Sequence, residues 1–332
     1  MVKYGLNDIA IVIINWNGQD LLERFLPQVV DYSKGSKIYL ADNASTDDSV
    51  EFVKERFPSI KIIQNQINNG YAKGYNVALK HVHEPIICLL NNDIEVTENW
   101  LVSINEEFNL DNNIAIIQPK ILDYNNKDYF EYAGAAGGFV DKYGYPFCRG
   151  RIFDTIEQDK GQYNNNCEIF WASGACFFIK NDVFKSLNGF DESYFAHMEE
   201  IDLCWRSFNN GHIAKFVGDS CVYHVGGATL KNTNPKKTFL NFRNSLFTLV
   251  KNTDSRLLGR IFTRMFLDGL AAIRFLFQLK PLFFIAVLKA HFAFYLSLSR
   301  ILKVRSISSK RPDYFKKNSI VWSYFIEKKK TF

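Results

Sequence analysis

Apolar and polar positions follow a regular alternation over the first 120 residues. Four apolar runs read as β-strands buried on both faces, and they lie at Ile9–Asn15, Lys37–Asp42, Ile60–Asn65 and Ile86–Leu90. Segments with helical spacing lie between them, after Trp16-Asn17-Gly18, from Ser45 onward and over Gly70–His81. We expect Ser45 to cap the second of these helices, with acidic residues in its first turn. This βαβα order predicts an α/β fold with a mostly parallel, doubly wound sheet.

The second part of the chain has a less regular pattern. Residues 121–165 are rich in Gly, Asn and Tyr and predict loops and a hairpin. Beyond them we expect a strand region broken at Ser173-Gly174, a short helix, a strand and a longer helix, over Cys167–Lys180, Glu199–Asn210, Ile213–Val217 and Thr238–Lys251. One or two long apolar and basic helices then reach about residue 303, followed by a basic tail.

The charge is divided unevenly along the chain. Residues 255–332 hold 16 Lys and Arg against three acids, or +13, whereas residues 1–254 hold 24 against 32, or −8. The composition, 47% hydrophobic and 23% charged, is that of a globular protein. The six cysteines form no CxxC pair, and the N-terminus has no signal-peptide pattern, so we expect a reducing cytoplasm.

The basic C-terminal helices carry a polar stripe. Arg256, Arg260, Arg264 and Asp268 recur at every fourth position beside apolar residues. The uncharged apolar stretches here, such as Pro281–Leu288, are shorter than the roughly 20 residues that a membrane span needs. Basic amphipathic helices of this kind suit the surface of an anionic membrane. The alternative is that they pack on the rest of the protein or on a second subunit; no recognition motif supports nucleic acid as a partner.

Polar side chains stand directly after three of the predicted strands. These clusters are Asn15-Trp16-Asn17, the segment from Asp42 to Asp47, and Asn91-Asn92-Asp93. Parallel strands of an open sheet end at one edge, where such folds bind ligands. Asp42 could accept a hydrogen bond from a nucleobase, and Asp93 could hold a hard cation on a diphosphate. Taken alone, Asn91-Asn92-Asp93 could equally be a turn.

A glycine-containing segment precedes the third predicted helix. It contains Asn69, Gly70, Gly74 and Asn76. Glycines at a helix N-terminus let the backbone approach an anion closely. A simple loop leading into a helix is the alternative interpretation.

Eight ordered motifs together resemble those of family 2 glycosyltransferases with the nucleotide-diphospho-sugar (GT-A) fold. They are Ile11-Val-Ile-Ile-Asn-Trp-Asn-Gly18, Asp42-Asn-Ala-Ser-Thr-Asp47, Asn69-Gly-Tyr-Ala-Lys-Gly-Tyr-Asn76, Asn91-Asn-Asp93, Ser173-Gly-Ala175, Gly189-Phe-Asp-Glu192, Glu199-Glu-Ile-Asp-Leu-Cys204 and Val222-Tyr-His-Val-Gly-Gly227. The resemblance covers about residues 8–252. It is strongest to the branch that contains rhamnosyltransferases of bacterial surface polysaccharides.

The resemblance implies a donor site and a divalent cation, Mg²⁺ or Mn²⁺. Asp42 would contact the nucleobase, and Asp93 would hold the cation. Asn91 stands where the family has the first aspartate of its DxD motif, and an amide is a poorer cation ligand than a carboxylate. His224 resembles a histidine that completes the metal coordination, although a structural histidine is the alternative. The remaining donor residues implied are Asn15, Asn17, Asn69, Gly70, Gly74, Asn76, Asn92 and Arg243.

The resemblance also places the catalytic base at Glu199-Glu200. Glu200 takes the position of the family's aspartate, so we expect Glu200 to be the base. Neighbouring helical residues do not face the same way, and Glu199 is therefore the alternative candidate rather than a second base. The alternative is that both acids complement the helix dipole. For Arg243 the alternative to a diphosphate contact is a surface ion pair. We expect Asp202 to be structural or acceptor-orienting, and Trp205 to lie in the core.

These observations predict three parts with one function. Residues 1–254 form the GT-A catalytic domain, with a nucleotide-sugar-binding half over 1–120 and an acceptor-binding half over 121–254; residues 255–332 form a basic amphipathic helical extension. The implied function is that of an inverting glycosyltransferase in bacterial cell-surface polysaccharide or lipopolysaccharide assembly. It would move a sugar from a nucleotide-diphospho-sugar to a saccharide or lipid-linked saccharide. We expect a cytoplasmic location on the inner face of the membrane, with a homodimer as a further option. The rival function is a catalytically silent nucleotide-sugar-binding protein. A nucleotidyltransferase shares the fold, but its glycine-rich N-terminal loop is missing from the sequence.

Overall fold

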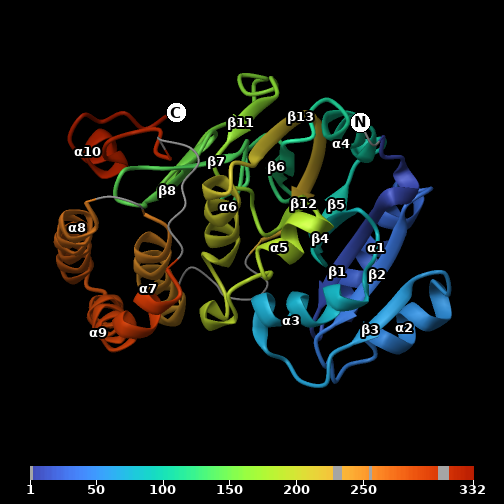
Figure 1. Ribbon diagram of the computed structural model, residues 1–332, viewed down its shortest axis with the longest axis horizontal. Helices are drawn as coiled ribbons and strands as arrows, with labels where there is room; N and C mark the ends of the chain where they lie inside the picture. Colours follow the sequence, from blue (N-terminus) through green and yellow to red (C-terminus); the bar gives the residue numbers. More distant parts are fainter. Residues whose placement is uncertain (1–2, 227–233, 254–255, 306–313) are drawn as a thin grey trace.

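The computed structural model describes residues 3–226, 234–253, 256–305 and 314–332. Its centre is a nine-stranded sheet with the strand order β11-β13-β6-β12-β4-β1-β2-β3, and β5 pairs with β13 beside this path (Figure 1). A second, four-stranded sheet has the order β10-β9-β8-β7. Gly227, the last residue of one sequence motif, lies outside the described residues.

The first half of the sheet has the predicted parallel, doubly wound arrangement. Its strands are β1 (Ile9–Asn15), β2 (Lys37–Asp42), β3 (Lys61–Gln64) and β4 (Ile86–Asn91). The helices between them are α1 (Gln19–Tyr32), α2 (Ser49–Arg56) and α3 (Gly70–Ala78), the last followed by a short 3₁₀ turn over Leu79–His81. In the register of the strands, Asn15 lies beside Asp42 and Ile14 beside Asn91. The three polar strand ends therefore meet at one edge, as the sequence predicted.

The expected start of the second helix was wrong. Helix α2 begins at Ser49, with Asp48 at the N-cap position, three residues later than predicted. Ser45 instead donates its hydroxyl to Asp42 Oδ1 at 2.5 Å, and its backbone N–H donates to Asp42 Oδ2 at 3.0 Å. Because the side chain of Asp42 accepts both hydrogen bonds, Ser45 is part of the sheet edge and does not cap a helix.

The second half of the sheet mixes parallel and antiparallel strands. It is built from β5 (Ile94–Val96), β6 (Ile114–Asp123), β11 (Cys167–Ile169), β12 (Cys176–Lys180) and β13 (Ile213–His224), with the helices α4 (Trp100–Phe108) and α5 (Asn181–Ser186). Strand β12 runs antiparallel to both β4 and β6, and β13 runs parallel to β6. The last strand was predicted too short. It continues beyond Val217 to His224, because after a register shift it pairs with both β6 and β5.

Residues 121–165 contain more strand than the predicted loops and hairpin. They form the small antiparallel sheet of β7 (Gly138–Val140), β8 (Pro146–Cys148), β9 (Arg151–Ile152) and β10 (Thr155–Ile156). These strands have at most three residues each, too few to show a period of two in the sequence.

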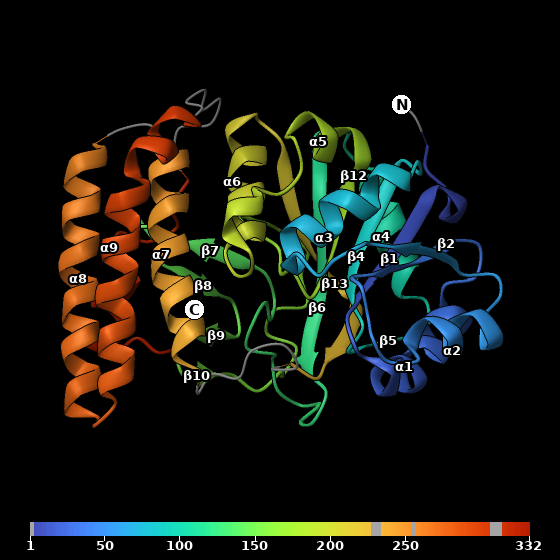
Figure 2. The same cartoon turned by 90° about the horizontal axis from the view of Figure 1, so that it is seen from below.

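Five further segments belong to the second half of the chain. They are the 3₁₀ turn η3 (Glu192–Tyr194) and the helices α6 (Glu199–Asn209), α7 (Pro235–Asn252), α8 (Leu257–Phe277) and α9 (Pro281–Lys303). Figure 2 shows α7, α8 and α9 side by side at the end of the molecule opposite β1–β3. The expected helices over 199–210 and 238–251 are therefore present, and two long helices follow residue 255.

The polar stripe of α8 faces the protein, not the solvent. Arg260, Arg264 and Asp268 keep only 7%, 3% and 0% of their surface exposed. On the other side of the same helix, Phe262 and Phe266 are 77% and 60% exposed. The spacing of the stripe was predicted correctly, but the sequence left open which way the stripe faces.

Helix α9 is more apolar than its short uncharged stretches suggested. Among the described residues it is the one helix whose length and composition would allow it to cross a membrane, with 23 residues and a mean hydropathy of 1.7 in its most apolar window. Only 22% of that window is buried inside the protein. The sequence prediction failed here because the single charge of Lys289 interrupts the run without lowering its average hydropathy much.

The C-terminal segment returns to the catalytic part of the molecule. Tyr314 stacks on Trp205 with ring centroids 4.7 Å apart, and Trp205 is buried in the core as predicted. A last helix, α10 (Ile320–Phe325), begins where the Ile320 N–H donates to Asp141 Oδ2 at 2.9 Å. One hydrophobic core thus contains residues from both sides of position 254, the predicted domain boundary.

Candidate active site

The carboxyl edge of β1, β2 and β4 is held together by hydrogen bonds between its polar side chains. Asn92 Nδ2 donates to Asn15 Oδ1 at 2.7 Å, and Asn15 Nδ2 lies 3.4 Å from Asp42 Oδ1. Asn15 and Asp42 are each only 1% exposed. Three predicted donor residues therefore form one continuous network, with the buried carboxylate of Asp42 at its far end.

The loop after β1 is tied to the loop after β2. The Asn17 N–H donates to Ser45 Oγ at 2.9 Å, and Asn17 Oδ1 accepts from the Thr46 N–H at 2.7 Å. Asn17 has a φ of +50°, a left-handed conformation that asparagine adopts more readily than most residues. Beside it Trp16 is 53% exposed. The two loops thus form one rim at the edge where the sequence placed the nucleobase.

The glycine-containing segment packs against the segment before α6. Gly70 has a φ of +79°, and a Cβ there would lie 2.6 Å from the carbonyl oxygen of Phe195. The Tyr71 N–H donates to that same oxygen at 3.2 Å. Asn76 exchanges two hydrogen bonds with the backbone of Phe190, at 2.8 and 2.9 Å.

The other two residues of this segment have separate settings. Asn69 is the N-cap residue of α3 but makes no side-chain cap bond. A Cβ at Gly74 would lie 3.0 Å from Asn43 Nδ2. The contacts of Gly70 and Asn76 hold α3 against the segment before α6, so a donor role for Asn69, Gly70, Gly74 and Asn76 stays a prediction.

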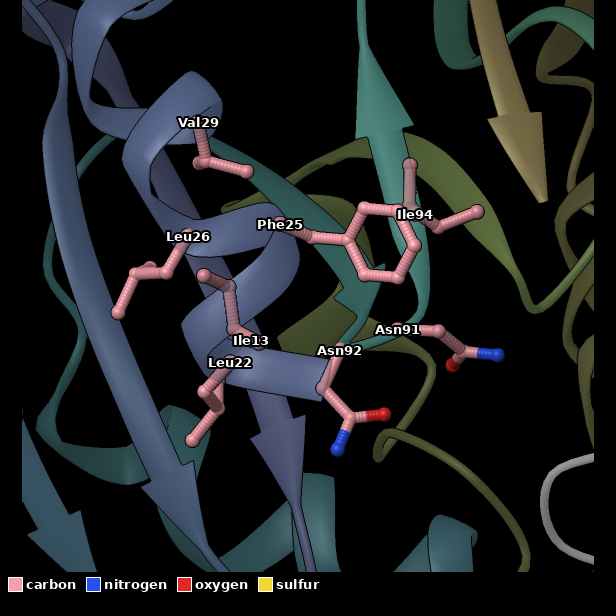
Figure 3. Close-up of a pocket in the computed structure, with 8 residues that line it drawn as sticks. All are labelled: Ile13, Leu22, Phe25, Leu26, Val29, Asn91, Asn92 and Ile94. Carbon is pink, nitrogen blue, oxygen red and sulfur yellow. The ribbon is translucent and has the colours of Figure 1, made fainter. Parts of the chain in front are cut away.

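Asn91 and Asn92 stand where the buried part of β4 ends. Figure 3 shows both amides beside apolar side chains from β1, α1 and β5, among them Phe25 and Ile94. The cavity among these side chains measures about 10 Å³, too small for any ligand larger than a water molecule. The Asn91 N–H donates to the Ala175 carbonyl at 2.9 Å. The apolar packing behind the amides fixes the backbone of the edge, and a ligand would lie on its outer side.

Asp93 and His224 come together, as the sequence predicted for a cation site. His224 Nε2 lies 3.2 Å from Asp93 Oδ1, and the Val225 N–H donates to the Asp93 carbonyl at 3.1 Å. Both side chains are buried. The pairing of β5 with β13, which places His224 opposite Ile94, brings the two residues together from positions 131 apart in the chain.

A third residue, Glu131, faces the other nitrogen of the histidine. Glu131 Oε1 lies 3.3 Å from His224 Nδ1. Burial lowers the pKa of His224, but Glu131 and Asp93 together outweigh burial and raise this pKa to about 10. Within the described ranges no three His, Cys, Asp or Glu side chains cluster as metal ligands. The reason is that the two carboxylates contact opposite sides of the ring, so they cannot share one ion.

The donor set at this point fits a divalent cation. Asp93 offers a carboxylate oxygen, and His224 Nε2 offers an imidazole nitrogen once a cation displaces its proton. Nucleotide-phosphate oxygens and water commonly supply the remaining ligands of such ions. A carboxylate on the second nitrogen orients a metal-binding histidine and makes it more basic. No sequence pattern pointed to Glu131, because it lies in the segment of poor periodicity.

Glu199 and Glu200 begin α6 directly after a turn with unusual backbone angles. Phe195, His197 and Met198 have φ values of +65°, +68° and +74°. Residues other than glycine rarely adopt this backbone conformation unless their surroundings hold them in it. The support comes from Asn244 of α7, whose Nδ2 donates to the carbonyls of Tyr194, Ala196 and His197 at 3.2, 3.0 and 2.8 Å.

The two glutamates differ in their surroundings. Burial, and next to it the charge of Glu200, raise the pKa of Glu199 well above its usual range. Burial also raises the pKa of Glu200, to about 7, although backbone N–H groups of the first turn of α6 counteract it. Glu199 is 5% exposed, whereas Glu200 keeps some contact with solvent. The contact of Glu200 with first-turn N–H groups is also what the helix-dipole interpretation expects.

Glu200 lies beside the segment that leads into β12. A Cβ on Gly174 would be 3.9 Å from the Cβ of Glu200 and 3.2 Å from the Tyr71 hydroxyl. That hydroxyl donates to the Gly174 carbonyl at 2.7 Å. The next residue, Ala175, accepts the hydrogen bond from the backbone of Asn91. Glu200 is therefore connected through a single dipeptide to the edge that carries Asn91.

Arg243 contacts the turn before α6 in this structure. Its Nη2 lies 3.4 Å from the carbonyl oxygens of both Ser193 and Tyr194. The guanidinium also stands 5.3 Å from the ring centres of Phe239 and Phe247. These contacts give Arg243 a part in shaping the turn, and its predicted contact with a diphosphate stays a prediction.

Asp202 is the centre of a buried charge network that joins α6 to α7. It accepts hydrogen bonds from Arg206 Nε at 2.9 Å, Lys251 Nζ at 3.0 Å and Asn252 Nδ2 at 2.9 Å. Burial alone would raise the pKa of Asp202, but Lys251 and Arg206 lower it to about 2. These contacts agree with the structural role expected for Asp202.

A mixed, mostly parallel sheet with a polar carboxyl edge and paired acids defines a class of α/β transferases that bind nucleotide-sugars. The sequence profile of glycosyl transferase family 2 matches residues 10–187, and the chain belongs to this family. It is a glycosyltransferase of the hexosyltransferase type, with the expected GT-A fold.

Two curated relatives and one solved structure illustrate the similarity. The low-salt glycan biosynthesis hexosyltransferase Agl10 of Haloferax volcanii is 22% identical over 285 residues, which cover 83% of this chain and 87% of the relative. The N-acetylglucosaminyl-diphospho-decaprenol L-rhamnosyltransferase of Mycobacterium tuberculosis is 22% identical over 231 residues, 65% of this chain and 75% of the relative. The crystal structure of GalNAc-T7 with UDP, GalNAc and Mn²⁺ superposes with a TM-score of 0.61 at 14% identity, over 88% of this chain and 57% of that one.

Proposed function

We propose that the protein is an inverting glycosyltransferase that works by a single displacement, with Glu200 as the catalytic base. The observation that carries the proposal is the position of Glu200 beside Gly174, next to the edge where Asp93 and His224 meet. In this reaction the acceptor hydroxyl gives its proton to the Glu200 carboxylate. Its oxygen then bonds to the anomeric carbon while the bond from that carbon to the diphosphate breaks. Attack from the side opposite the leaving group inverts the configuration.

Glu200 suits the role of base better than Glu199. A base must be ionised to take a proton, and it works best with a pKa near the working pH. The pKa of Glu200, about 7, meets both conditions, whereas burial and the charge of Glu200 raise the pKa of Glu199 well above its usual range, and the side chain of Glu199 is more deeply buried. We assign Glu199 the role of a buried neighbour that keeps the local environment of Glu200 dry.

The polar edge binds the donor in this proposal. Asp42 and Asn15 lie at the end of the edge that would bind the nucleobase, and Asn17 lies in the adjoining rim. Asn92, the residue after Asn91, is hydrogen-bonded to Asn15. Asp93 and His224 would hold Mg²⁺ or Mn²⁺, with Glu131 orienting the histidine. The bound cation would offset the negative charge that develops on the diphosphate. The presence of Mn²⁺ in the GalNAc-T7 structure supports a divalent ion of this kind.

The relatives suggest the substrates. One acts as a hexosyltransferase in glycan biosynthesis and another transfers L-rhamnose to a decaprenol-linked sugar. We therefore propose a nucleotide-diphospho-hexose donor, with a nucleotide-activated rhamnose as the first to test, and a lipid-linked saccharide acceptor. The product would enter a cell-surface polysaccharide or lipopolysaccharide. A lipid-linked acceptor places the protein at the cytoplasmic face of the cell membrane.

A comparison of Glu200→Gln with wild type tests the proposal. Nucleotide-sugars are first screened for thermal stabilisation of the wild type, since a bound ligand raises apparent stability. With the donor so found, Glu200→Gln should retain donor binding and lose at least about 100-fold of the transfer rate. Glu199→Gln is the matched control and should keep more activity than Glu200→Gln. Undiminished transfer by Glu200→Gln rules out the assigned base; donor binding without transfer by the wild type, across the acceptors tried, favours the silent binding protein.

A further inference from the structure

Helix α8 is amphipathic, but its apolar side faces outward and its charged side faces the protein, the reverse of a helix on the surface of a water-soluble protein. Such a helix normally turns its apolar side to the core and its charged side to water. In α8 the charged residues Arg264 and Asp268 are buried, and Phe262 and Phe266 are mostly exposed. Leu258 in the first turn and Phe277 at the end are 84% and 85% exposed. The apolar side of the helix therefore faces outward along its whole length.

A buried polar cluster fixes this orientation. Arg264 Nε donates to Asp268 Oδ1 at 3.0 Å, and the Tyr145 hydroxyl donates to the same oxygen at 2.6 Å. The Arg264 guanidinium lies 3.6 Å from the centre of the Tyr145 ring. On α9, His291 Nε2 lies 3.5 Å from Asp268 Oδ2. Because the polar partners of α8 come from the small sheet and from α9, the helix cannot rotate its apolar side inward without breaking this cluster.

Helix α9 extends the apolar surface. Its residues Leu288, Phe292 and Leu296 are 50%, 65% and 73% exposed, and Leu279 in the turn between the helices is 89% exposed. The Tyr295 hydroxyl lies 3.3 Å from Met265 Sδ, which joins the two helices along their seam. We call the outward side chains of α8 and α9 the hairpin face, defined by Leu258, Phe262, Phe266, Leu288, Phe292 and Leu296. Isolated apolar side chains are common on protein surfaces, but many large exposed apolar side chains on two adjacent helices mark an interaction site.

The charges around the hairpin face identify its partner. Asp268 is the one acid between residues 255 and 305, and it is buried. The exposed charges here are all positive: Arg256, Arg274, Lys280, Lys289, Arg300 and Lys303. Long basic side chains beside an apolar face can lay their alkyl stems on lipid and place their charges at anionic headgroups. A second copy of the chain would bring like charges together, because the same face would meet itself.

We propose that the hairpin face lies in the surface layer of an anionic lipid bilayer and anchors the enzyme there. Both helices pack against the protein along their length, and the buried Arg264 and Asp268 sit near the middle of α8. A membrane-spanning hairpin would carry these charges into the hydrocarbon, where they are strongly disfavoured. Insertion of the outward side alone leaves the polar cluster inside the protein. The hairpin therefore lies on the membrane and does not cross it.

This arrangement places the proposed active site beside the bilayer. Figure 2 shows the turn between α8 and α9 on the same side of the molecule as the carboxyl end of β6, which pairs there with the His224 end of β13. A bilayer that contacts the hairpin near this turn would lie on the side of the molecule from which a lipid-linked acceptor would have to arrive. This last step rests on the proposed function; the anchoring itself does not.

Flotation of the full-length protein with vesicles tests the anchor without any substrate. Wild type should float with vesicles containing phosphatidylglycerol and much less with vesicles of phosphatidylcholine alone. The double variant Phe262→Glu/Phe266→Glu should bind the anionic vesicles at least about tenfold more weakly, since it loses two inserted rings and gains two negative charges. The matched control is Val102→Glu/Leu110→Glu, which makes the same charge change at exposed positions of the α4 region and should float like wild type. Lys289→Glu should selectively weaken binding to the anionic vesicles.

Light scattering without vesicles completes the experiment. If wild type is a dimer and the Phe262→Glu/Phe266→Glu variant is a monomer, a second copy covers the hairpin face. That result would overturn the proposal. Wild type that stays unbound, or equal losses in the double variant and its control, would overturn it as well. Transfer to a water-soluble acceptor should be unchanged in the double variant, so a failure of membrane binding is distinguishable from a failure of the proposed activity.

Discussion

The Glu200→Gln substitution should change how the stability of the protein depends on pH. Burial raises the pKa of Glu200 from 4.5 to about 7 in the folded protein. The folded state therefore favours the protonated form. The resulting contribution to stability is complete below about pH 4.5, decreases from there, and is lost as the pH rises through about 7. Glutamine does not titrate, so the variant lacks this loss.

The structure sets the size of the effect. A difference of about 2.5 pKa units at about 1.4 kcal/mol each gives an upper limit of about 3.5 kcal/mol. Glu200 keeps some contact with solvent, and its charge interacts with Glu199. Both facts reduce the net effect, and we expect about 1–2 kcal/mol.

Urea unfolding at pH 5 and pH 8 measures the difference. The free energy of unfolding of wild type should fall by about 1–2 kcal/mol more than that of Glu200→Gln between the two pH values. Groups that titrate in both proteins cancel in this comparison. The control Glu106→Gln removes an exposed glutamate and should behave like wild type. An identical pH dependence in wild type and Glu200→Gln would refute the assignment of Glu200 as a buried carboxyl that titrates near neutrality. In wild type kcat/KM should rise with pH through about 7, the pH range in which Glu200 ionises.

Four further substitutions test other parts of the structure. Asp93→Ala should lower cation-dependent transfer by about 100-fold, while Asn91→Ala should cost less than about tenfold, as measured by titration with Mg²⁺ and Mn²⁺; equal losses would contradict the ligand assignment. Gly70→Ala should lower the free energy of unfolding by about 1–2 kcal/mol, because alanine is strained at a φ of +79° and its Cβ would meet the Phe195 carbonyl at 2.6 Å; a stability within error of wild type would show that the α3 contact yields easily. Asp202→Asn should lower it by about 2–3 kcal/mol, since Lys251 and Arg206 lose a buried counter-charge, and a neutral result would show that Asp191 suffices for Lys251.

The donor-binding edge could be predicted from sequence because its determinants are local. Each apolar run ended in a polar residue, and parallel strands bring such ends together whatever the details of packing. Asn15, Asp42 and Asn92 accordingly share one network. Even here the prediction for Ser45 was wrong, since its sequence context suits a helix cap as well as a bond to the sheet edge. Only the position of Asp42 in the folded structure decides between these two roles.

The orientation of α8 could not be predicted because it depends on distant segments. The spacing of Arg260, Arg264 and Asp268 specifies a polar stripe but not what the stripe faces. The partner is Tyr145, more than a hundred residues earlier in the chain. The same reason applies to Glu131 and Asn244, whose positions beside His224 and the turn before α6 follow from tertiary packing.

The hydrogen bond between Ile320 and Asp141 has a consequence for how the chain folds as it is made. Asp141 also accepts from the N–H groups of Tyr143 and Tyr145, both at 2.9 Å, so one carboxylate organises the β7–β8 turn and the C-terminal segment together. The two ends of this contact lie 179 residues apart. At about 5–20 residues per second, a ribosome needs roughly 10 s or more to supply the second end after the first. Until then the apolar side chains of the small sheet are not yet covered by the C-terminal segment. A nascent chain paused in α9 is therefore the species most exposed to aggregation, and shortened versions that stop there should give poor soluble yields.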